Sequence, residues 1–254
     1  GTSRAFLFGG NASFVVVANL TITKYAVIAQ NGAVGGPFPG SPSDAGGAWL
    51  VEGCVLTLNH GAGAHLRAAG RSGSIVRGCR VHRNGQLGLN AGNSTLIENN
   101  DISENNFAGF SQGWEAGGVK VAGVSDVVIR KNRIMDNNGT GLWADICSTR
   151  VSYLDNLIVN QSGPGISHEI SFDATIRGNV VCGNGWGKPV WLWGAQIQVQ
   201  NSERVLVYNN TVVVGPRRGN GLAIQQQNRT QCASLVAGSP FHVARHNTFE
   251  MTIS

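Results

Sequence analysis

Short runs in which apolar and polar residues alternate recur along the whole chain. Most of these runs are rich in Val and Ile, as in the stretches that begin at Val51, Val76 and Ile97. A period of two residues is typical of β-strands, whereas few stretches carry the i, i+3, i+4 apolar spacing of an amphipathic helix. The pattern therefore predicts an all-β protein of short strands joined by turns.

Six of these runs share one motif, apolar-x-x-N-x-apolar-x-x-N-x-x-x-G. The first polar position holds Cys54, Cys79, Asn100, Asn132, Asn156 and Asn179, and the second holds Asn59, Asn84, Asn105, Asn137, Gln161 and Asn184. Consecutive first positions are 25, 21, 32, 24 and 23 residues apart. A repeat of this length with strand periodicity predicts stacked coils, because one coil buries its inner face only by pairing with the next.

The recurring Asn residues are predicted to be structural. An Asn side chain fits a left-handed turn, and amides stacked about 4.8 Å apart on successive coils hydrogen-bond along a ladder. The glycines that close the motif are expected to occupy turn positions with positive φ. These glycines are Gly63, Gly88, Gly109, Gly141 and Gly165.

The motifs resemble those of right-handed parallel β-helix repeat proteins of the pectate-lyase-like superfamily, over roughly Phe14 to Phe249. The stretches GWEAGGVK (113–120), GLWADI (141–146) and GISHEIS (165–171) are also similar to bacterial members known only by their repeats. The resemblance implies a single domain over residues 1–254, folded as a single-stranded right-handed parallel β-helix of about 9–10 coils with three loop insertions. Whether the chain is an excerpt of a longer one stays open.

Members of this superfamily are mostly extracellular polysaccharide lyases, hydrolases and epimerases, and some are phage tailspikes or adhesins. The resemblance therefore implies an extracellular or cell-surface protein whose partner is a polysaccharide. It leaves the reaction open, because the repeat motifs identify the fold and not the chemistry.

Three insertions break the regular spacing of the motif. They lie between Asn19 and Cys54, between Asn100 and Asn132, and between Asn179 and Asn210. Insertions in a solenoid form loops on one face, which is often the binding face. Four of the six tryptophans lie in the last two insertions, where they either stack on sugar rings or fasten the loops to the coil. They are Trp114, Trp186, Trp191 and Trp193.

The strand after each closing glycine predicts which side chains face outward. In GLWAD, an inward Leu142 places Trp143 and Asp145 outward. The same register places outward His65, Arg67, Lys120, Ser167, Glu169, Gln196, Gln198, Gln225 and Gln227. His168 is expected to point inward unless a bulge redirects it. On stacked coils these residues form a polar strip with about 4.8 Å per coil, close to the repeat of an extended sugar chain.

Two kinds of catalysis are compatible with this strip. Asp145 and Glu169 lie one coil apart, so their carboxyl groups are expected about 5 Å apart, as in a retaining glycosidase. In a uronate lyase or epimerase, Lys120 or Arg67 would neutralise the substrate carboxylate, and Lys120 or an exposed His168 would be the base. The catalytic candidates are Lys120, Asp145, Glu169 and His168. The substrate-binding candidates are Arg67, His65, Trp114, Glu115, Trp143, Gln196, Gln198 and Gln225.

Composition changes this picture only slightly. The chain has 254 residues, a net charge of +5 and a pI of about 9.2, which weakly favours an anionic partner. The 19 Lys and Arg residues form no run, so no nucleic-acid partner is expected. No apolar stretch reaches the roughly 18 residues of a membrane span. No amphipathic helix caps either end, so end-to-end or oligomeric contacts stay open.

The cysteines and carboxylates indicate no certain cofactor. Five cysteines is an odd number, and no C-x-x-C motif points to zinc or thioredoxin-like chemistry. Cys54 and Cys79 lie one coil apart, where stacked buried thiols are favoured over a disulfide. A Ca²⁺ site formed by Asp145, Glu169 and Glu115 stays an alternative without a supporting motif.

The sequence thus carries two hypotheses. The first is an extracellular enzyme that cleaves or epimerises an extended glycan, with an anionic, uronate-containing glycan as one option. The second is a non-catalytic β-helix that binds glycans or serves as a unit of a fibre, spike or assembly. In the second case Lys120, Asp145 and Glu169 would form a surface salt-bridge ladder of little energetic value.

Overall fold

A computed structural model of the chain describes residues 6–8, 12–35, 47–67, 73–187, 193–216, 219–227, 232, 243–245 and 248–251. The described residues form the strands β1 to β27 and no helix. Accordingly, the part of the chain that the structure describes holds no apolar helix of membrane-spanning length. All strand pairs are parallel and belong to three nine-stranded sheets, which we call sheets 1, 2 and 3.

The strands alternate among the three sheets in chain order. Sheet 1 contains β1 (Leu7–Phe8), β4 (Gly32–Gly35), β7 (Ala62–Leu66), β10 (Leu87–Ala91), β13 (Gly117–Ala122), β16 (Thr140–Asp145), β19 (Ile166–Glu169), β22 (Ile197–Gln200) and β25 (Leu222–Gln225). Sheet 2 contains β2 (Val16–Ala18), β5 (Leu50–Glu52), β8 (Ile75–Arg77), β11 (Leu96–Glu98), β14 (Val128–Arg130), β17 (Ser152–Leu154), β20 (Thr175–Arg177), β23 (Leu206–Tyr208) and β26 (Val243–Arg245). Sheet 3 contains β3 (Thr21–Thr23), β6 (Val55–Thr57), β9 (Arg80–His82), β12 (Asp101–Ser103), β15 (Arg133–Met135), β18 (Leu157–Val159), β21 (Val180–Cys182), β24 (Thr211–Val214) and β27 (Thr248–Met251).

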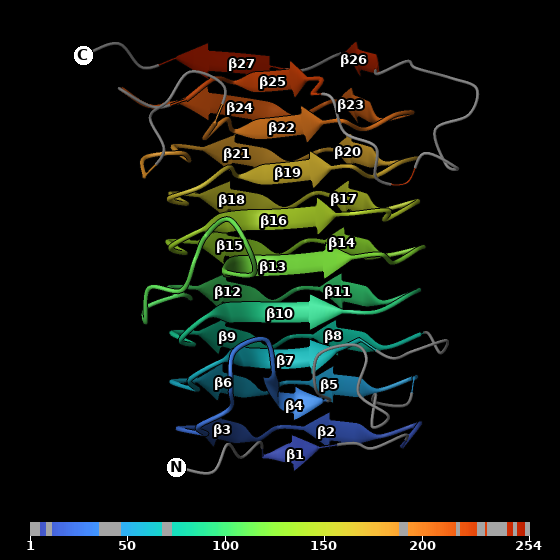
Figure 1. Cartoon of the computed structure of the whole chain (residues 1–254), viewed down its shortest axis with the longest axis vertical. Helices are drawn as coiled ribbons and strands as arrows, with labels where there is room; N and C mark the ends of the chain where they lie inside the picture. Colours follow the sequence, from blue (N-terminus) through green and yellow to red (C-terminus); the bar gives the residue numbers. More distant parts are fainter. Residues whose placement is uncertain are drawn as a thin grey trace.

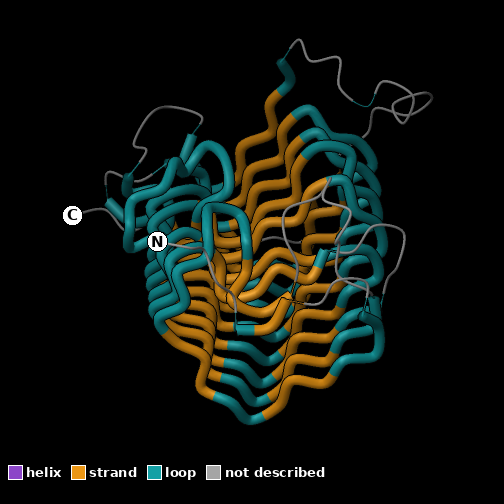
Figure 2. The backbone as a smooth tube through the Cα atoms, turned by 60° about the horizontal axis from the view of Figure 1, so that its bottom comes forward, coloured by secondary structure: helices purple, strands orange, loops and turns teal. Residues whose placement is uncertain are grey.

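Each set of three consecutive strands makes one coil, and the coils stack along the long axis of the molecule. Figure 1 shows this stack from β1 at the N-terminal end to β27 at the C-terminal end, and Figure 2 shows the sheets around a common interior. Residues one repeat apart become neighbours, as in the registered pairs Ile97–Ile129 and Ile129–Tyr153. The predicted parallel β-helix is therefore confirmed.

Sheets 2 and 3 show the alternation that the sequence predicts. In β11 and β18, for example, the middle residue is buried and the two flanking residues are half-buried. The inward residues stack in continuous apolar columns, which supply the hydrophobic stabilisation of the coils. Sheet 1 is different, because all residues of β10 and β16 are buried on both faces. The outer face of sheet 1 is therefore covered as well, and the insertion loops cover it, for example where Trp114 and Glu115 contact Lys120 and Asn90.

The Asn residues form the two predicted ladders between the coils. In the first ladder, Nδ2 of Asn100 donates to Oδ1 of Asn132 at 3.0 Å, and Nδ2 of Asn132 donates to Oδ1 of Asn156 at 3.0 Å. The second ladder runs in the same way through Asn105 and Asn137 at 2.9 Å. Each amide also bonds backbone groups of the turns, so the ladders satisfy buried polar groups that the turns leave open.

Most closing glycines do not have the predicted positive φ. Among the five, Gly109 alone has a positive φ, of 73°. Gly88 and Gly141 instead start strands of sheet 1, where an added Cβ would lie 2.6 Å from the carbonyl oxygen of the glycine on the next coil. The left-handed positions are occupied mainly by the residues just before the ladder amides, such as Lys131 and Asp155. The turn prediction was therefore wrong for Gly88 and Gly141, where glycine is required by the close approach of two backbones.

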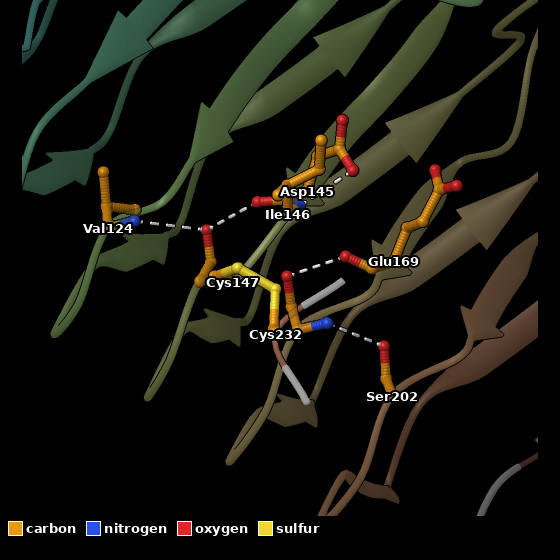
Figure 3. Close-up of a disulfide and its surroundings, with 9 residues drawn as sticks. Val124, Asp145, Ile146, Cys147, Glu169, Ser202 and Cys232 are labelled. Atoms are coloured by element: carbon orange, nitrogen blue, oxygen red, sulfur yellow. Dashed lines mark hydrogen bonds between the residues drawn. A yellow bond between two sulfur atoms is a disulfide. The ribbon is translucent and has the colours of Figure 1, made fainter. Parts of the chain in front are cut away.

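The cysteines divide into a ladder pair and a disulfide. Cys54 and Cys79 are free and buried, and the Cys54 backbone N–H lies 3.4 Å from the Cys79 sulfur. Burial raises the pKa of the Cys79 thiol to about 11, so it stays protonated and unreactive. Cys147 and Cys232 form a disulfide across 85 residues, which the sequence did not predict. It fixes Cys232 to the turn after β16 (Figure 3).

Candidate functional site

The outer face of sheet 1 carries two rows of side chains that follow the strand register. The first row consists of His65, Asn90, Lys120, Trp143, Ser167 and Gln198. The second row consists of Ala122, Asp145, Glu169, Gln200 and Gln225, where Asp145 and Glu169 follow the registered pair Ala144–His168. Apart from Asn90, Ala122 and Gln200, all of them were predicted to face outward, and the strand register confirms this orientation. Their roles in binding or catalysis stay predictions.

Three contacts hold Lys120 in the centre of the first row. Its Nζ lies 3.0 Å from Oδ2 of Asp145 and 3.6 Å from the ring centroid of Trp143, and it donates to the carbonyl oxygen of Trp114. Only 4% of Lys120 is exposed. Because its charge and its hydrogen atoms are engaged by these groups, Lys120 connects the loop between β12 and β13 to the sheet. This position suits a structural role better than that of a catalytic base.

The buried Glu115 and the half-buried Arg67 lie beside Lys120 and complete a charged cluster. Nδ2 of Asn90 lies 3.5 Å from Oε2 of Glu115. Arg67 extends toward the turn at Gly123, where a Cβ on the glycine would lie 3.3 Å from the guanidinium. Burial raises the pKa of the Glu115 carboxyl, and this effect exceeds the opposing influence of the Lys120 and Arg67 charges.

Glu115 should therefore make the stability of the protein depend on pH. A carboxyl whose pKa is higher in the folded state than its ordinary value of 4.5 binds a proton more tightly when folded. Its contribution to stability is complete below pH 4.5 and is lost as the pH rises through the folded-state pKa. We expect Glu115→Gln to gain stability relative to the wild type between acidic and neutral pH, as measured by chemical denaturation. A difference that stays constant or declines with rising pH would contradict this expectation.

Asp145 and Glu169 form a pair of carboxylates at the ends of the adjacent strands β16 and β19. Neighbouring strands lie about 4.8 Å apart, and Figure 3 shows both side chains pointing to the same side. Serine hydroxyls hold the strand ends, because Ser148 donates to the Asp145 carbonyl at 3.0 Å and Ser171 donates to the Glu169 carbonyl at 2.7 Å. The backbone N–H of Ile146 donates to Oδ1 of Asp145 at 2.8 Å. The pair is thus placed before any ligand binds.

A pocket of about 150 Å³ lies next to this carboxylate pair. Residues of sheet 1 line it together with Gln112, Gly113, Trp193 and Gly194 from two of the insertions. Gln112 in the first loop is fixed by a hydrogen bond of 2.7 Å from its Nε2 to Oδ1 of Asn138. The lining residues are Gln112, Gly113, Thr140, Trp143, Pro164, Ser167, Glu169, Trp193, Gly194 and Gln198. The size suits one sugar ring, and two indoles border it.

Two residues that line this pocket each carry a buried polar group without a hydrogen-bond partner among the described residues. These groups are the indole N–H of Trp143 and Oε1 of Gln198, and both side chains are more than nine-tenths buried. Buried polar groups are nearly always paired in folded proteins, because an unpaired one costs about 1–3 kcal/mol. One unpaired donor and one unpaired acceptor on residues that line the same pocket point to a ligand that supplies both partners.

Two of the predicted site residues do not face the outer surface of sheet 1. His168 points inward, as the alternation predicts, and its Nδ1 lies 3.2 Å from the Tyr153 hydroxyl. It is separated from the outer face by the sheet, so it is not part of the pocket. Gln196 was expected on the outer face, but it is fully buried and its Oε1 accepts from Nδ2 of Asn184 at 2.8 Å. Gln196 thus continues the second amide ladder, because Gly215 takes the place of the next Asn in the repeat and has no side chain to accept from Asn184.

The remaining binding candidates lie around the pocket and not in it. His65 is fully buried at the N-terminal end of the first row. Trp114 is 63% exposed but does not line the pocket, and Gln225 lies two strands beyond Glu169 in the second row. Trp186 donates its indole N–H to the Asn160 carbonyl at 3.1 Å and so fastens its loop to the coil. Trp191 lies outside the described residues.

The pocket also contains residues that the sequence did not single out as site residues. Thr140, Ser167 and Pro164 line it, together with Gln112 and Trp193 from the insertions. The broken repeat spacing located both insertions, but no local signal indicated how their chain segments cross the sheet. Only Trp193 carried a chemical hint, because its indole is suited to stacking on a sugar.

The acidic residues do not fit a calcium site. Among the described residues, no three His, Cys, Asp or Glu side chains are grouped to hold a metal ion. The Lys120 ammonium group, 3.0 Å from Asp145, takes the position that a cation beside this carboxylate would need. A Ca²⁺ ion coordinated by Asp145, Glu169 and Glu115 stays an untested prediction that the donor set does not support.

Comparison with solved structures finds the same fold at low sequence identity. A structure of XylC in complex with xylose has a TM-score of 0.67 and 16% identity, over 90% of this chain and 39% of that chain. The A-module of the mannuronan C-5 epimerase AlgE6 from Azotobacter vinelandii has a TM-score of 0.68 and 17% identity, over 97% and 64%. The Dettilon tailspike protein gp208 has a TM-score of 0.54 and 15% identity, over 84% and 50%.

The chain spans between about two fifths and just under two thirds of the length of these proteins. No curated protein matches its sequence. The family model described as "Right handed beta helix region" matches residues 42–212, which is about two thirds of the chain and contains the carboxylate pair and the pocket. The chain therefore belongs to the right-handed β-helix family.

Proposed function

We propose that this protein binds an extended polysaccharide along the outer face of sheet 1 and hydrolyses it at the Asp145–Glu169 pair. The observation that carries the proposal is the pocket beside this pair, with Trp143 and Trp193 on its border and two lining residues whose buried polar groups lack a protein partner. The aligned side chains of successive coils repeat about every 4.8 Å, so a glycan chain can follow them in register.

In the proposed reaction the two carboxylates have different roles. Glu169 lines the pocket and acts as the general acid, which protonates the leaving oxygen while its bond to the anomeric carbon breaks. Asp145, next to the positive charge of Lys120, attacks the anomeric carbon and forms a covalent glycosyl ester. Water then cleaves this ester while Glu169 takes its proton. The separation expected for adjacent strands, about 5 Å, corresponds to retention of configuration.

Hydrolysis explains the arrangement better than elimination or epimerisation. Those reactions need a cation for the substrate carboxylate and a base for the C5 proton. Lys120 is buried and paired with Asp145, and His168 faces the interior, so neither is placed as a base on the outer face. Arg67 lies beside Glu115 and the turn at Gly123, away from the pocket.

The related structures support a carbohydrate ligand, and the disulfide supports a location outside the cytosol. A xylose complex and a mannuronan epimerase are among the proteins with the same fold, although their low identity carries no residue roles to this chain. The Cys147–Cys232 disulfide is typical of an oxidising environment. We therefore place the protein outside the cytosol, at the cell surface or in the extracellular space.

One observation favours a second function without catalysis. Both carboxylate oxygens of Asp145 already have protein partners, Oδ1 with the Ile146 N–H and Oδ2 with Lys120. A carboxylate fixed in this way can be purely structural. In that case the same pocket would bind glycans without cleaving them.

Incubation with a panel of polysaccharides separates these functions. Hydrolysis releases reducing ends, elimination produces unsaturated ends that absorb in the ultraviolet, and epimerisation changes the NMR spectrum without cleavage. We expect reducing ends without unsaturated ends, and a retained anomeric configuration in the first product. Binding without turnover would support the non-catalytic module, whereas neither binding nor turnover would reject both functions.

Replacing Trp193 by Ala should weaken glycan binding by about tenfold, because an indole that stacks on a sugar ring contributes about 1–2 kcal/mol. Trp193 borders the pocket and remains 39% exposed, so its removal leaves the core unchanged. The matched control is Trp114→Ala, which removes an exposed indole outside the pocket and should change affinity less than about twofold. Titration calorimetry with the best glycan measures both. Equal losses in the two variants would mean that the pocket is not the stacking site.

A further inference from the structure

We propose that the pocket accepts an uncharged sugar unit, so that the polysaccharide is neutral along this part of the chain and not a polyuronate. The inference rests on the proposed function, because it concerns the ligand of the same pocket. It opposes the weak preference for an anionic partner that the net charge of +5 suggests. The argument depends on the local charges, which act on a bound sugar more strongly than the net charge does.

No described residue that lines the pocket carries a positive charge. Among the described residues that line it, Glu169 alone has an ionisable side chain. Asp145 follows in the same row one strand away. A sugar carboxylate held in the pocket would therefore find no cation to replace its lost water, and it would meet a like charge whenever Glu169 is ionised; both effects cost affinity.

The nearest lysine, Lys120, does not give the pocket a positive charge. Lys120 lies on β13, on the far side of Trp143 from Ser167 in the first row, and it does not line the pocket. Its ammonium group packs against the Trp143 ring and pairs with Asp145 at 3.0 Å. A uronate in the pocket would have to break this ion pair to gain a cation.

The two unpaired polar groups also fit a hydroxyl better than a carboxylate. The indole of Trp143 offers a donor and Oε1 of Gln198 offers an acceptor. The Gln198 amide is oriented by its own Nε2, which donates to Oε1 of Gln200 at 2.8 Å. A sugar hydroxyl can accept from the indole and donate to the amide, whereas a carboxylate can only accept and would leave Gln198 unpaired.

The outer face beyond the pocket carries amides in place of charges. Gln198 bonds Gln200, and Nε2 of Gln200 donates to Oε1 of Gln227 at 3.0 Å. Gln225 continues the second row beside Gln200. Amides of this kind hydrogen-bond sugar hydroxyls without selecting a charge. A neutral chain would thus run from the carboxylate pair toward β22 and β25.

Matched oligosaccharides test this inference. The probes are β-1,4-mannan and β-1,4-mannuronate oligomers of equal length, and β-1,4-glucan and β-1,4-glucuronate oligomers, since each pair differs only at C6. Calorimetry is expected to show at least about tenfold tighter binding of a neutral member than of its uronate partner. The variant Gln198→Lys, which places a cation in the pocket, should reduce this ratio by about tenfold. The matched control Thr211→Lys adds the same charge on exposed β24 and should leave the ratio unchanged.

The possible outcomes are distinct. Tighter binding of a uronate by the wild type would overturn the inference while leaving the proposed function in place. An unchanged ratio in Gln198→Lys would also overturn it. If that variant does not fold, Glu169→Gln replaces it: at a pH at which Glu169 is ionised, this exchange removes a negative charge and should raise uronate affinity severalfold. Absence of binding and cleavage with all four probes and the wider panel would reject the proposed function itself.

Discussion

Glu169→Gln is expected to lower the rate of polysaccharide hydrolysis by about 10³-fold while glycan binding is retained. A general acid contributes about 10²- to 10⁴-fold, and Gln keeps the size and hydrogen bonding of Glu but cannot donate its proton. The side chain lies at the border of the pocket and the strand end is held through the backbone carbonyl by Ser171. The exchange therefore removes the chemistry with little change in structure.

Two measurements separate this role from a merely structural one. A substrate with an activated aryl leaving group needs no protonation, so the variant should lose far less activity on it than on the polysaccharide. Added azide should restore turnover and yield a glycosyl azide of retained configuration. The control Glu104→Gln changes a half-exposed carboxylate on the turn after β12 and should retain full activity. Equal losses on both substrates would show that Glu169 is not the acid.

Asn132→Ala is expected to lower the free energy of unfolding by about 3–5 kcal/mol. Asn132 is 2% exposed, and its Nδ2 donates to the Ile97 carbonyl at 2.9 Å and to Oδ1 of Asn156 at 3.0 Å. Its Oδ1 accepts from the backbone N–H and from Nδ2 of Asn100, both at 3.0 Å. Alanine leaves these groups on three coils without their partners, and each unpaired buried group costs about 1–3 kcal/mol.

Chemical denaturation monitored by tryptophan fluorescence measures this loss. The control is the neighbouring Arg133→Ala, which removes an exposed side chain whose ion pair with Asp101 is long, at 3.8 Å. Such surface pairs contribute about 0–1 kcal/mol, so the control should unfold close to the wild type. A comparable midpoint for the two variants would mean that the amide ladder does not hold the coils together.

Much of the fold could be predicted from the spacing of a few residue types. The alternation of Val and Ile with polar residues indicated the strands, and the Asn positions indicated which residues stack. These predictions succeeded because coil pairing is local in space once the repeat length is known, so one coil determines the environment of the next. The same alternation correctly placed Trp143, Asp145 and Glu169 on one face and His168 on the other.

The predictions failed where residues interact across an insertion or between distant coils. Gln196 follows the strand alternation in sequence, yet it occupies the place of an Asn in the amide ladder. The closing glycines Gly88 and Gly141 resemble turn residues but allow close backbone contact between coils. Cys147 and Cys232 have no shared motif, because their pairing depends on the path of a chain segment that separates them by 85 positions.

The amino-acid sequence by itself determined the coil architecture, the amide ladders and the face on which Asp145 and Glu169 lie, since a two-residue alternation and a regular repeat leave little geometric freedom. Only the tertiary structure decided that Lys120 is buried against Trp143 and Asp145, and that Gln112 and Trp193 close a pocket over sheet 1. Those contacts depend on where two irregular loops cross the sheet and how far side chains reach between coils, and no periodic pattern encodes either.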